Sequence, residues 1–534
     1  MNKTCPSIRG FLIQQRAPAW LFAGILAVAG NCETSAAEWG AFRGPSHDGS
    51  TPETVRSNWS EEPPRVLWRV SMRNGFSSFS VSEDRAFTLV ERRVGSNDSE
   101  MCVALNAATG QELWAASVDT ADQYDGTGIS GATGPRSTPV VDGGRVYVLS
   151  AYLNLVCFDA ATGNRVWSHD LISEYGSAQP IPWQSAAAPV VEGDLVLIMG
   201  RVPGQNIMAF RKGDGALAWS RHNDGMTHAT PTVTTLNGVR QVLFYAQSGL
   251  VSLAPTTGDV LWRHAFNYNG TSAGASPVLA DNLIYCSRAY PGSTTSARAG
   301  AIVVQLNYDN GRFSTAMKWR KVNQLMNHWA TPVHHGGFVY GIYGQYNSGG
   351  SSVDLKCVDL SNGEEKWTRS LSGEGSRSGG IVKVADKLLL LTETGDLVLF
   401  KPNPASFSQV ARFSALQGKC WNVPAVSGGR VYARSTTEAV CVDLAPPAPP
   451  VLAPLKTSIA KSGDTVEVRV SRSDDSALDA ATASRIRILE SLDLAGPWTK
   501  LLTDPALANG VLKVQKPFPA GETKRFFKAE QIPQ

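Results

Sequence analysis

The segment CFDAATGNRVW at Cys157–Trp167 decides the fold, because close variants of it recur along the chain. In these variants a glycine stands four residues before a tryptophan, at 110, 163, 215, 258 and 363. Gly311 precedes Trp319 by eight residues, which indicates an insertion in that copy. The repeat tryptophans lie 43–57 residues apart, the period of propeller blades or solenoid units. They are Trp68, Trp114, Trp167, Trp219, Trp262, Trp319 and Trp367.

The repeated phrase has a physical explanation as a tight turn followed by a strand. Asp159 can accept hydrogen bonds from the backbone amides ahead of it, and Gly163 supplies a positive φ that other residues resist. The following strand places Trp167 between two sheets, where the ring buries on the order of 200 Å². We therefore interpret the repeated residues, including the tryptophans, as architecture.

A second phrase precedes the first in each unit and is typical of a hairpin. STPVVDGGRVYVLSA at 137–151 has a proline, an apolar run, two glycines and another apolar run. In other copies the second strand, such as DLVLIMG at 194–200, is apolar on both faces and must be covered by other layers. Propeller blades provide this environment, because each sheet packs against the next around a central axis.

The third strand of each unit can be counted. The last one has no outer strand after it, whereas RVLWRV at 65–70 is an outer strand with no third strand before it. If these two strands pair in one sheet, they complete the last blade and every strand belongs to a blade. The sequence thus predicts an all-β fold, an eight-bladed β-propeller over 65–445 closed by the Trp68 segment. The third strands lie near Ala104, Cys157, Ala209, Ser252, Gln305, Cys357, Val398 and Cys441.

Composition and the chain ends define the remaining organisation. The hydrophobic fraction of 43% excludes a disordered chain. At 534 residues the chain is too long for one ordinary core. Its formal charge of +3 gives no reason to expect a nucleic-acid partner. An extension over 38–64 precedes the propeller, and PPAPPVLAP at 446–454 is typical of a stiff linker. Alternating segments over 455–534 predict a small all-β, sandwich-like domain.

Residues 1–37 are typical of an export signal. Basic residues precede an apolar stretch over 17–30 that is too short to span a bilayer comfortably. Small residues permit cleavage after Ala29 or Ala37, and no transmembrane span is expected once the signal is removed. A buried N-terminal helix and a lipid anchor on Cys32 are the alternatives. We expect an exported protein that is periplasmic, extracellular or associated with the envelope.

The cysteines beyond this leader are predicted to be free, buried thiols. Cys157, Cys357 and Cys441 share one repeat position at which other copies carry alanine or serine, so the position suits a small side chain. Oxidation to disulfides is the alternative in an exported protein. The full set is Cys102, Cys157, Cys286, Cys357, Cys420 and Cys441.

The phrase A/C-x-D/N-x-x-T-G-x-x-x-W, in units closed by an N-terminal strand, resembles the pyrroloquinoline-quinone-like (PQQ-like) propeller family over roughly residues 39–445. This family includes quinoprotein alcohol dehydrogenases and a non-catalytic lipoprotein that assists the assembly of outer-membrane barrels. WGAFRGPSHDGST at 39–51 and GPRSTP at 134–139 resemble an exported bacterial subgroup of unsettled function.

Residues just before the repeat prolines are the candidate ligand-binding residues. In a propeller, the loops that enter the innermost strands share one face around the axis, so these side chains are predicted to converge there. Aromatic, imidazole and guanidinium groups suit a planar or anionic ligand. A solvated funnel with polar rims is the alternative. The candidates are Arg136, Trp183, Gln184, His228, Asn327, His328, Trp329, Arg377, Trp421 and Asn422.

The resemblance implies that a quinoprotein dehydrogenase would show adjacent cysteines, a tryptophan floor, calcium ligands and an aspartate base. No two cysteines are adjacent here. Trp183, Trp329 or Trp421 suits a floor, but no carboxylate before the prolines matches a calcium ligand. Asp125 and Asp224 are predicted to lie in inter-blade loops without a recognisable partner. PQQ and calcium are therefore expected only if this alternative holds.

No metal site is predicted from the histidines. His334 and His335 lie at a predicted hairpin turn, and His228 and His328 have no third ligand. We interpret the chain as an exported, non-catalytic binding or assembly scaffold, monomeric, with an envelope protein, peptide or glycan as partner. A PQQ-dependent dehydrogenase acting on alcohols or sugars is the alternative from the enzyme class. A structural envelope component with an empty funnel is the third hypothesis.

Overall fold

The chain separates into two compact units, one over residues 35–446 and one that contains residues 447–534. The leader predicted over 1–37 lies outside the described residues, as does most of the predicted linker, residues 447–454. The computed structural model describes residues 38–121, 134–178, 181–267, 273–289, 299–345, 352–374, 378–446, 455–462, 464–474, 476–491, 497–501, 505–517 and 525–531.

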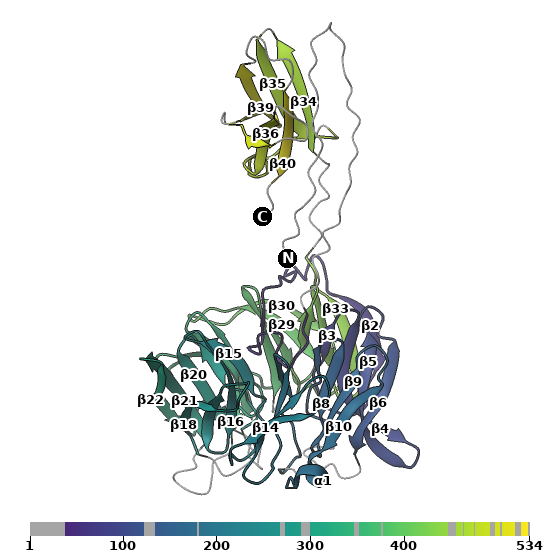
Figure 1. Cartoon of the computed structure of the whole chain (residues 1–534), viewed down its shortest axis with the longest axis vertical. Coiled ribbons are helices and arrows are strands. Elements are labelled where there is room, and N and C mark those ends of the chain that lie inside the picture. Colours follow the sequence, from purple (N-terminus) through teal and green to yellow (C-terminus); the bar gives the residue numbers. More distant parts are fainter. Residues whose placement is uncertain are drawn as a thin grey trace. The chain divides into compact units, whose positions relative to one another are not determined.

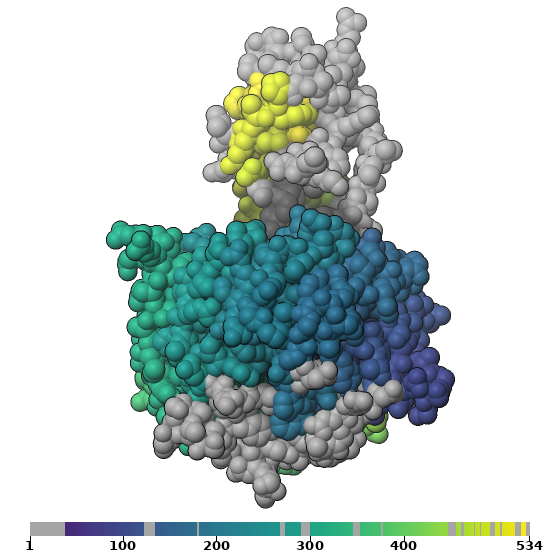
Figure 2. Space-filling view, turned by 60° about the horizontal axis from the view of Figure 1, so that its bottom comes forward, coloured from purple at the N-terminus to yellow at the C-terminus, as the bar shows by residue number. Residues whose placement is uncertain are grey.

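The larger unit is built from antiparallel sheets whose strands follow one another in the sequence, as in propeller blades. In Figure 2 the chain colour passes from blue through teal to green around this unit. The first blades are β3 (Ser80–Ser82), β4 (Arg85–Val94), β5 (Asn97–Asn106) and β6 (Glu112–Thr120); β7 (Val140–Asp142), β8 (Arg145–Leu149), β9 (Asn154–Asp159) and β10 (Arg165–Asp170); β11 (Val190–Glu192), β12 (Leu195–Met199), β13 (Ile207–Arg211) and β14 (Leu217–Arg221); and β15 (Thr232–Leu236), β16 (Val239–Ala246), β17 (Gly249–Leu253) and β18 (Val260–Ala265).

The next blades continue the same pattern, and the short helix α1 (Leu171–Tyr175) follows β10 (Figure 1). One of these blades is mixed, because β1 (Ser50–Thr51) pairs with its first strand in parallel. The strands are β19 (Val278–Ala280), β20 (Leu283–Arg288), β21 (Gly300–Asp309) and β22 (Arg312–Val322); β23 (Val333–His335), β24 (Phe338–Gln345), β25 (Ser352–Asp359) and β26 (Glu365–Ser370); and β27 (Gly379–Val384), β28 (Lys387–Thr392), β29 (Asp396–Lys401) and β30 (Ser408–Ser414).

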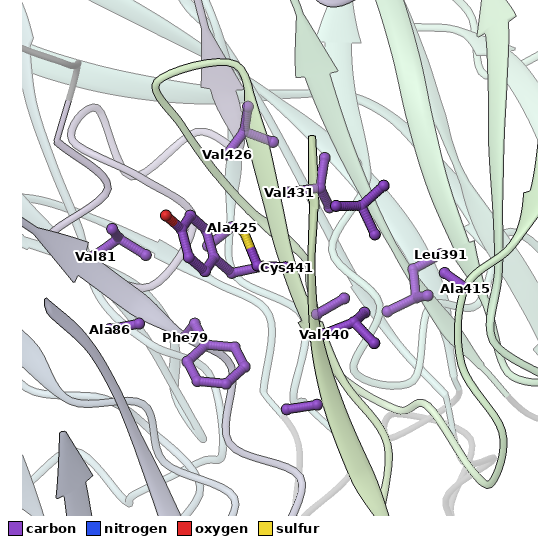
Figure 3. Close-up of a cluster of buried hydrophobic side chains, with 14 of the residues drawn as sticks. Phe79, Val81, Ala86, Leu391, Ala415, Ala425, Val426, Val431, Val440 and Cys441 are labelled. Atoms are coloured by element: carbon purple, nitrogen blue, oxygen red, sulfur yellow. The ribbon is translucent and has the colours of Figure 1, made fainter. Parts of the chain in front are cut away.

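The last blade combines strands from the two ends of the repeat region. β31 (Ala425–Ser427), β32 (Arg430–Arg434) and β33 (Glu438–Asp443) form a sheet with β2 (Arg65–Ser71), in which Trp68 pairs with Cys441. The pairing predicted from the sequence is therefore confirmed. Figure 3 shows the apolar side chains of this blade between Phe79 of the first blade and Leu391 of the preceding one, all within one core.

A buried arginine also joins the last blade to the first. Arg434 of β32 is fully buried and donates hydrogen bonds to the Leu89 carbonyl at 2.6 Å and to the Arg73 carbonyl at 2.6 Å. The same guanidinium donates to Thr88 Oγ1 at 3.2 Å. Burial lowers the pKa of Arg434 to about 9, because the charged form loses its hydration. Backbone and side-chain hydrogen bonds thus act together where the two ends of the repeat region meet.

The turn of the repeated phrase forms as predicted. Asp159 Oδ1 accepts hydrogen bonds from the amides of Ala161 (3.2 Å) and Thr162 (3.1 Å) and from the Thr162 hydroxyl (2.9 Å). Gly163 has a φ of 73°, in the left-handed region that side chains disfavour. The pKa of Asp159 is lowered chiefly by its hydrogen bond from the Thr162 hydroxyl.

Every repeat tryptophan except Trp262 donates its indole N–H to a carbonyl in the turn of the following blade. A Cβ placed on Gly163 would lie 2.7 Å from Cδ2 of Trp114, and the indole Nε1 of Trp114 donates to the Ala160 carbonyl at 3.0 Å. The lengthened turn around Gly311 leaves open space beside that glycine. Accordingly, Trp262 of the preceding blade donates to Gln241 Oε1 at 2.7 Å within its own sheet.

The segment over 38–64 crosses the innermost strands of several blades. Trp39 forms a β-bridge with Val81 of the first blade, and the Gly40 carbonyl accepts from the Val141 amide at 2.7 Å in the second. Further on, Arg43 donates to the Thr331 carbonyl at 3.0 Å. The segment then pairs through β1 with β27. It therefore links the innermost parts of several blades.

The smaller unit contains two sheets that share a core. Val468, Ile488, Val514 and Phe527 are buried in it and come from both sheets. The short helix α2 (Ala480–Ala483) precedes β36. The strands are β34 (Leu455–Ser462), β35 (Thr465–Arg472), β39 (Val511–Pro517) and β38 (Ala506–Ala508) in one sheet, and β37 (Thr499–Lys500), β36 (Ile486–Ser491) and β40 (Phe526–Gln531) in the other.

The six cysteines of the described part are free and buried, which confirms the predicted thiols. Burial raises the pKa of each thiol, to about 11 for Cys357 and to about 12 for Cys157 and Cys441. No helix among the described residues is both long and apolar enough to cross a membrane.

Candidate functional site

The residue directly before each repeat proline and the residue three places before it have different roles. The residue directly before the proline is held extended by the proline ring. Its serine or threonine hydroxyl bonds to the neighbouring blade, so these buried side chains form a belt. The bonds of the belt are Ser78 amide to Thr138 Oγ1 (3.1 Å), Ala188 amide to Thr230 Oγ1 (3.0 Å), Ser276 Oγ to the Thr230 carbonyl (2.9 Å), Ser276 amide to Thr331 Oγ1 (2.9 Å) and Val423 amide to Ser78 Oγ (3.0 Å).

The residue three places before the proline carries the candidate site. Arg136, His228, Trp329 and Trp421 stand at this position before Pro139, Pro231, Pro332 and Pro424. The first blade has Phe79 in place of the proline, and its equivalent residue is Phe76. Because the belt fixes the backbone two residues further on, the side chains at this position are directed to the same end of the ring.

Side chains from several of these loops meet in a continuous row, which we call the aromatic shelf and define as Phe76, His328, Trp329 and Trp421. The Trp329 and Trp421 ring centroids lie 4.9 Å apart, and Phe76 stacks on Trp421 at 4.9 Å and 22°. His328 lies 3.9 Å from Trp329. The Arg136 guanidinium lies 5.7 Å from the Phe76 centroid. Four of the predicted candidates are therefore brought together with Phe76.

Charged side chains orient the shelf at Trp421. The indole Nε1 of Trp421 donates to Glu393 Oε1 at 2.8 Å, and Glu393 is 9% exposed. Lys419 Nζ lies 4.6 Å from the Trp421 centroid, within the range of a cation–π interaction. On the other tryptophan, the buried Nε1 of Trp329 has no hydrogen-bond partner among the described residues. The shelf thus presents ring faces, two cations and an unused donor.

A glycine provides the space for Trp329. Gly274 stands three residues before Pro277, at the position that carries an aromatic residue in other blades. A Cβ on Gly274 would lie 3.2 Å from the Trp329 Cβ and 3.0 Å from the His328 carbonyl. The Gly274 amide donates to that carbonyl at 3.2 Å. A side chain at this position would therefore push the shelf out of place.

Three other candidates lie together on the neighbouring loops. His228 Nε2 is 2.9 Å from the Gln184 carbonyl oxygen, and Gln184 follows Trp183 directly. Trp183 and Gln184 both have positive φ values, 64° and 59°. Such angles are disfavoured for residues with a Cβ, and they mark a loop held by its surroundings.

Two asparagines of the candidate set are used inside the fold. Asn327 is fully buried, accepts from the Tyr285 hydroxyl at 2.7 Å and donates to the Ile342 carbonyl at 2.7 Å. Asn422 is 4% exposed and donates to the Arg434 carbonyl at 3.1 Å. Their side chains therefore stabilise the loops beside the shelf. The last candidate, Arg377, lies outside the described residues.

The described residues do not fit a calcium–quinone centre. Among them, no group of three or more His, Cys, Asp or Glu side chains could hold a metal ion. Glu393 is the carboxylate that touches the shelf, and it already accepts from Trp421. Asp224 accepts from Arg263 at 2.9 Å, and His334 Nε2 accepts from the Gly337 amide at 3.2 Å. Asp125 lies outside the described residues.

Sequence reasoning missed Phe76, Lys419 and Glu393. Phe76 was missed because the search used prolines and the first blade has Phe79 at that position. An alignment on the strands that follow, Ser80–Ser82 and Val140–Asp142, places Phe76 opposite Arg136. Glu393 lies in the turn between β28 and β29, which has no proline signal, so only the fold brings it to Trp421.

Comparison with known proteins identifies the family of the larger unit. The family model described as outer membrane protein assembly factor BamB matches residues 65–181 and 97–369. These matches together span residues 65–369, more than half of the chain. Outer membrane protein assembly factor BamB from Moranella endobia (strain PCIT) is 24% identical over 269 residues. That match covers 49% of this chain and only 63% of the relative's length.

Two solved structures resemble the fold. Quinohemoprotein alcohol dehydrogenase from Comamonas testosteroni has a TM-score of 0.53 at 12% identity, covering 80% of this chain and 83% of its own. A europium-containing methanol dehydrogenase has a TM-score of 0.52 at 10% identity, covering 75% of this chain and 90% of its own. At such identities the likeness shows the fold alone. From the match over residues 65–369, the chain belongs to the PQQ-like propeller-repeat family described as outer membrane protein assembly factor BamB.

Proposed function

We propose that this protein is an exported, non-catalytic scaffold that holds an envelope protein or peptide on the aromatic shelf. The observation that carries the proposal is the row of rings from His328 to Phe76, flanked by Arg136 and Lys419. Membership of a family described as an outer membrane protein assembly factor supports an assembly role in the envelope. Export is supported by the leader-like residues 1–37.

We further infer that the sheets of the larger unit are the eight blades of a closed ring. The supporting contacts are the β2–β33 pairing and the contact between β31 and β3, the innermost strands of the last and first blades. The belt bond from the Val423 amide to Ser78 Oγ at 3.0 Å spans the same junction. A rigid ring suits a scaffold, because the shelf residues come from several blades and must keep their spacing.

The chemistry of the shelf favours a partner with planar or apolar groups beside a negative charge. Trp329 and Trp421 are partly exposed, and the uncovered parts of their rings offer apolar area to aromatic, proline or sugar rings. Arg136 and Lys419 attract acidic groups, and Trp329 Nε1 can donate to a carbonyl after a small rearrangement. An extended peptide with aromatic and acidic residues meets all of these features, and a glycan with an acidic sugar meets most.

The test is quantitative recovery of partners with the full chain. Tagged wild type and a Trp329→Ala/Trp421→Ala variant would be cross-linked in native cells and compared by mass spectrometry. We expect at least a tenfold loss of the recovered envelope partner in the variant. Tyr308→Ala, on the distant β21–β22 hairpin, is the matched control and should recover the partner normally. Equal recovery by all three proteins, or quinone-dependent dye reduction by the wild type, would contradict the proposal.

A further inference from the structure

A small cavity lies between the segment over 38–64 and the innermost strands of several blades. Its volume is about 70 Å³, and its walls come from this segment and from the innermost strands β15, β19, β23 and β27. Arg43, His47 and Asp48 line it from the segment, and Thr232, His334 and Lys383 line it from the strands. The cavity therefore sits where the segment joins several blades.

Three polar groups of this cavity are buried and unpaired. Arg43 Nε, His47 Nδ1 and Thr232 Oγ1 have no hydrogen-bond partner among the described residues. Arg43 and Thr232 are each only 2% exposed, so bulk water does not hydrate them freely. Buried polar groups in folded proteins are nearly always paired. Three unpaired groups around one space indicate an occupant that accepts hydrogen bonds.

The charges around the cavity favour an anion as this occupant. Arg43 donates only to neutral carbonyls, those of Thr331 at 3.0 Å, Asp48 at 2.7 Å and Pro332 at 2.8 Å. The Lys383 ammonium forms no ion pair with any described residue. A buried guanidinium without a counter-ion is unfavourable unless an anion approaches it.

The charge of Asp48 raises the pKa of Arg43, but burial outweighs it and lowers that pKa to about 10, so the carboxylate offsets the buried charge only in part. The Asp48 carboxylate accepts from the Ser50 amide at 2.8 Å and from the Ser50 hydroxyl at 2.7 Å. His47 is neutral at pH 7, because burial lowers its pKa to about 4. The pKa of His334 is also lowered, chiefly by burial. Two cations thus face the cavity with one carboxylate that is already hydrogen-bonded.

We propose that this cavity binds a small tetrahedral oxyanion of the phosphate or sulfate type. Its oxygens would accept from Arg43 Nε and the Thr232 hydroxyl, and the Lys383 ammonium would neutralise its charge. The volume is several times the roughly 10–15 Å³ that a cavity needs to hold one water, which suits a group of a few heavy atoms. The bound anion would fasten the N-terminal segment to the innermost strands, a role separate from partner binding on the shelf.

The experiment measures anion binding to the full chain by calorimetry, with inorganic phosphate and sulfate in chloride buffer of constant ionic strength. We expect saturable binding by the wild type. Lys383→Gln should raise the dissociation constant at least tenfold. Lys387→Gln, on the same hairpin but paired with Asp386 at 2.8 Å, is the matched control and should bind like the wild type. Thr232→Val should weaken binding several-fold without lowering the melting temperature in chloride.

Melting temperatures need the same comparison, because phosphate and sulfate also stabilise proteins by exclusion from their surfaces. Phosphate should therefore raise the melting temperature of the wild type more than that of Lys383→Gln. The same gain in the wild type and both cavity variants would overturn the proposal. A crystal structure grown in phosphate that shows only water between Arg43 and Thr232 would also overturn it.

Discussion

The indole of Trp68 covers the backbone of Gly110 so closely that a Cβ on this glycine would lie 2.7 Å from Cδ2 of the ring. Trp68 belongs to β2 and Gly110 to the turn of the first blade. The indole Nε1 also donates to the Ala107 carbonyl of that turn at 3.0 Å. The contact that joins consecutive blades elsewhere therefore joins the last blade to the first.

Gly110→Ala should destabilise the protein through two effects, the positive φ of 74° and the overlap with Trp68. Gly144→Ala is the matched control, because Gly144 has a φ of 75° and open space where the Cβ would be. Strain alone costs about 1–2 kcal/mol, and overpacking adds about 1–3 kcal/mol. Urea denaturation should therefore show the larger loss for Gly110→Ala. Equal losses of unfolding free energy would mean that Trp68 moves away from the added methyl group without destabilising the fold.

Arg434→Met should loosen the junction between the last and first blades. The substitution leaves the buried Leu89 carbonyl and the partly buried Arg73 carbonyl without this donor. We expect a loss of about 2–5 kcal/mol in the free energy of unfolding. Arg165→Met is the control, since exposed Arg165 makes one bond, to the Ser117 carbonyl at 2.9 Å. A similar, small effect of both substitutions in denaturant titrations would refute the role assigned to Arg434.

Glu393 acts as a positioning residue through its hydrogen bond to Trp421. Glu393→Leu should reduce partner recovery several-fold, because the indole loses the acceptor that fixes its ring plane. Glu393→Gln keeps a carbonyl oxygen at the same place and should restore recovery. Partner recovery by cross-linking and mass spectrometry measures both variants. If Gln behaves like Leu, the charge of Glu393 matters more than its geometry, and the positioning role is wrong.

The stability of the protein should fall between pH 6.5 and pH 4 because of His47. Its pKa is lowered to about 4, first by burial and then by Arg240, against the opposing effects of Glu192 and Asp48. The unfolded chain binds this proton near pH 6.5, so the stability present above 6.5 is lost as the pH falls toward 4. The loss attributable to His47 is about 3 kcal/mol, at 1.36 kcal/mol per pKa unit.

Denaturant titrations of wild type and His47→Asn in chloride buffer test this dependence. Asparagine tolerates the positive φ of 56° at this position. The variant should lose less stability than the wild type between pH 6.5 and pH 4. His264, His334 and His335 also have lowered pKa values and remain in both proteins. Parallel pH profiles would show that the pKa of His47 is the same in the folded and unfolded states, which contradicts the prediction.

The repeat and its closure could be predicted because local chemistry determines them. Asp159 and Gly163 specify a turn through hydrogen bonds within five residues, and alternation of apolar residues specifies the strands. The pairing of Trp68 with Cys441 followed from counting strands. The phrase did not reveal that five of the repeat tryptophans pack on the glycine of the next copy, namely Trp68, Trp114, Trp167, Trp219 and Trp319. That contact joins residues about one repeat apart, so no local signal reports it.

The candidate site was only partly accessible from the sequence. Proline spacing located Trp329 and Trp421, because the residue three places earlier has a fixed direction. The looser criterion of lying shortly before a proline also selects Asn327 and Asn422, although their side-chain amides donate to backbone carbonyls within the fold. Burial and hydrogen bonding separate such residues from ligand-facing ones, and both depend on side chains from distant blades. The cavity beneath Arg43 gave no sequence signal for the same reason.

The pairing of β2 with β33 also has a consequence for biosynthesis. Arg65 and Asp443, which form an ion pair at 2.9 Å, are 378 residues apart. At about 5–20 residues per second, a ribosome needs about 20–75 s to make the intervening chain. Throughout that interval β2 is an unpaired edge on a nascent protein. In a neighbouring copy, β33 can be complete while the β2 of that copy is still unpaired. This β33 can then pair with β2 of the first molecule, so synthesis of many copies close together favours swapped dimers.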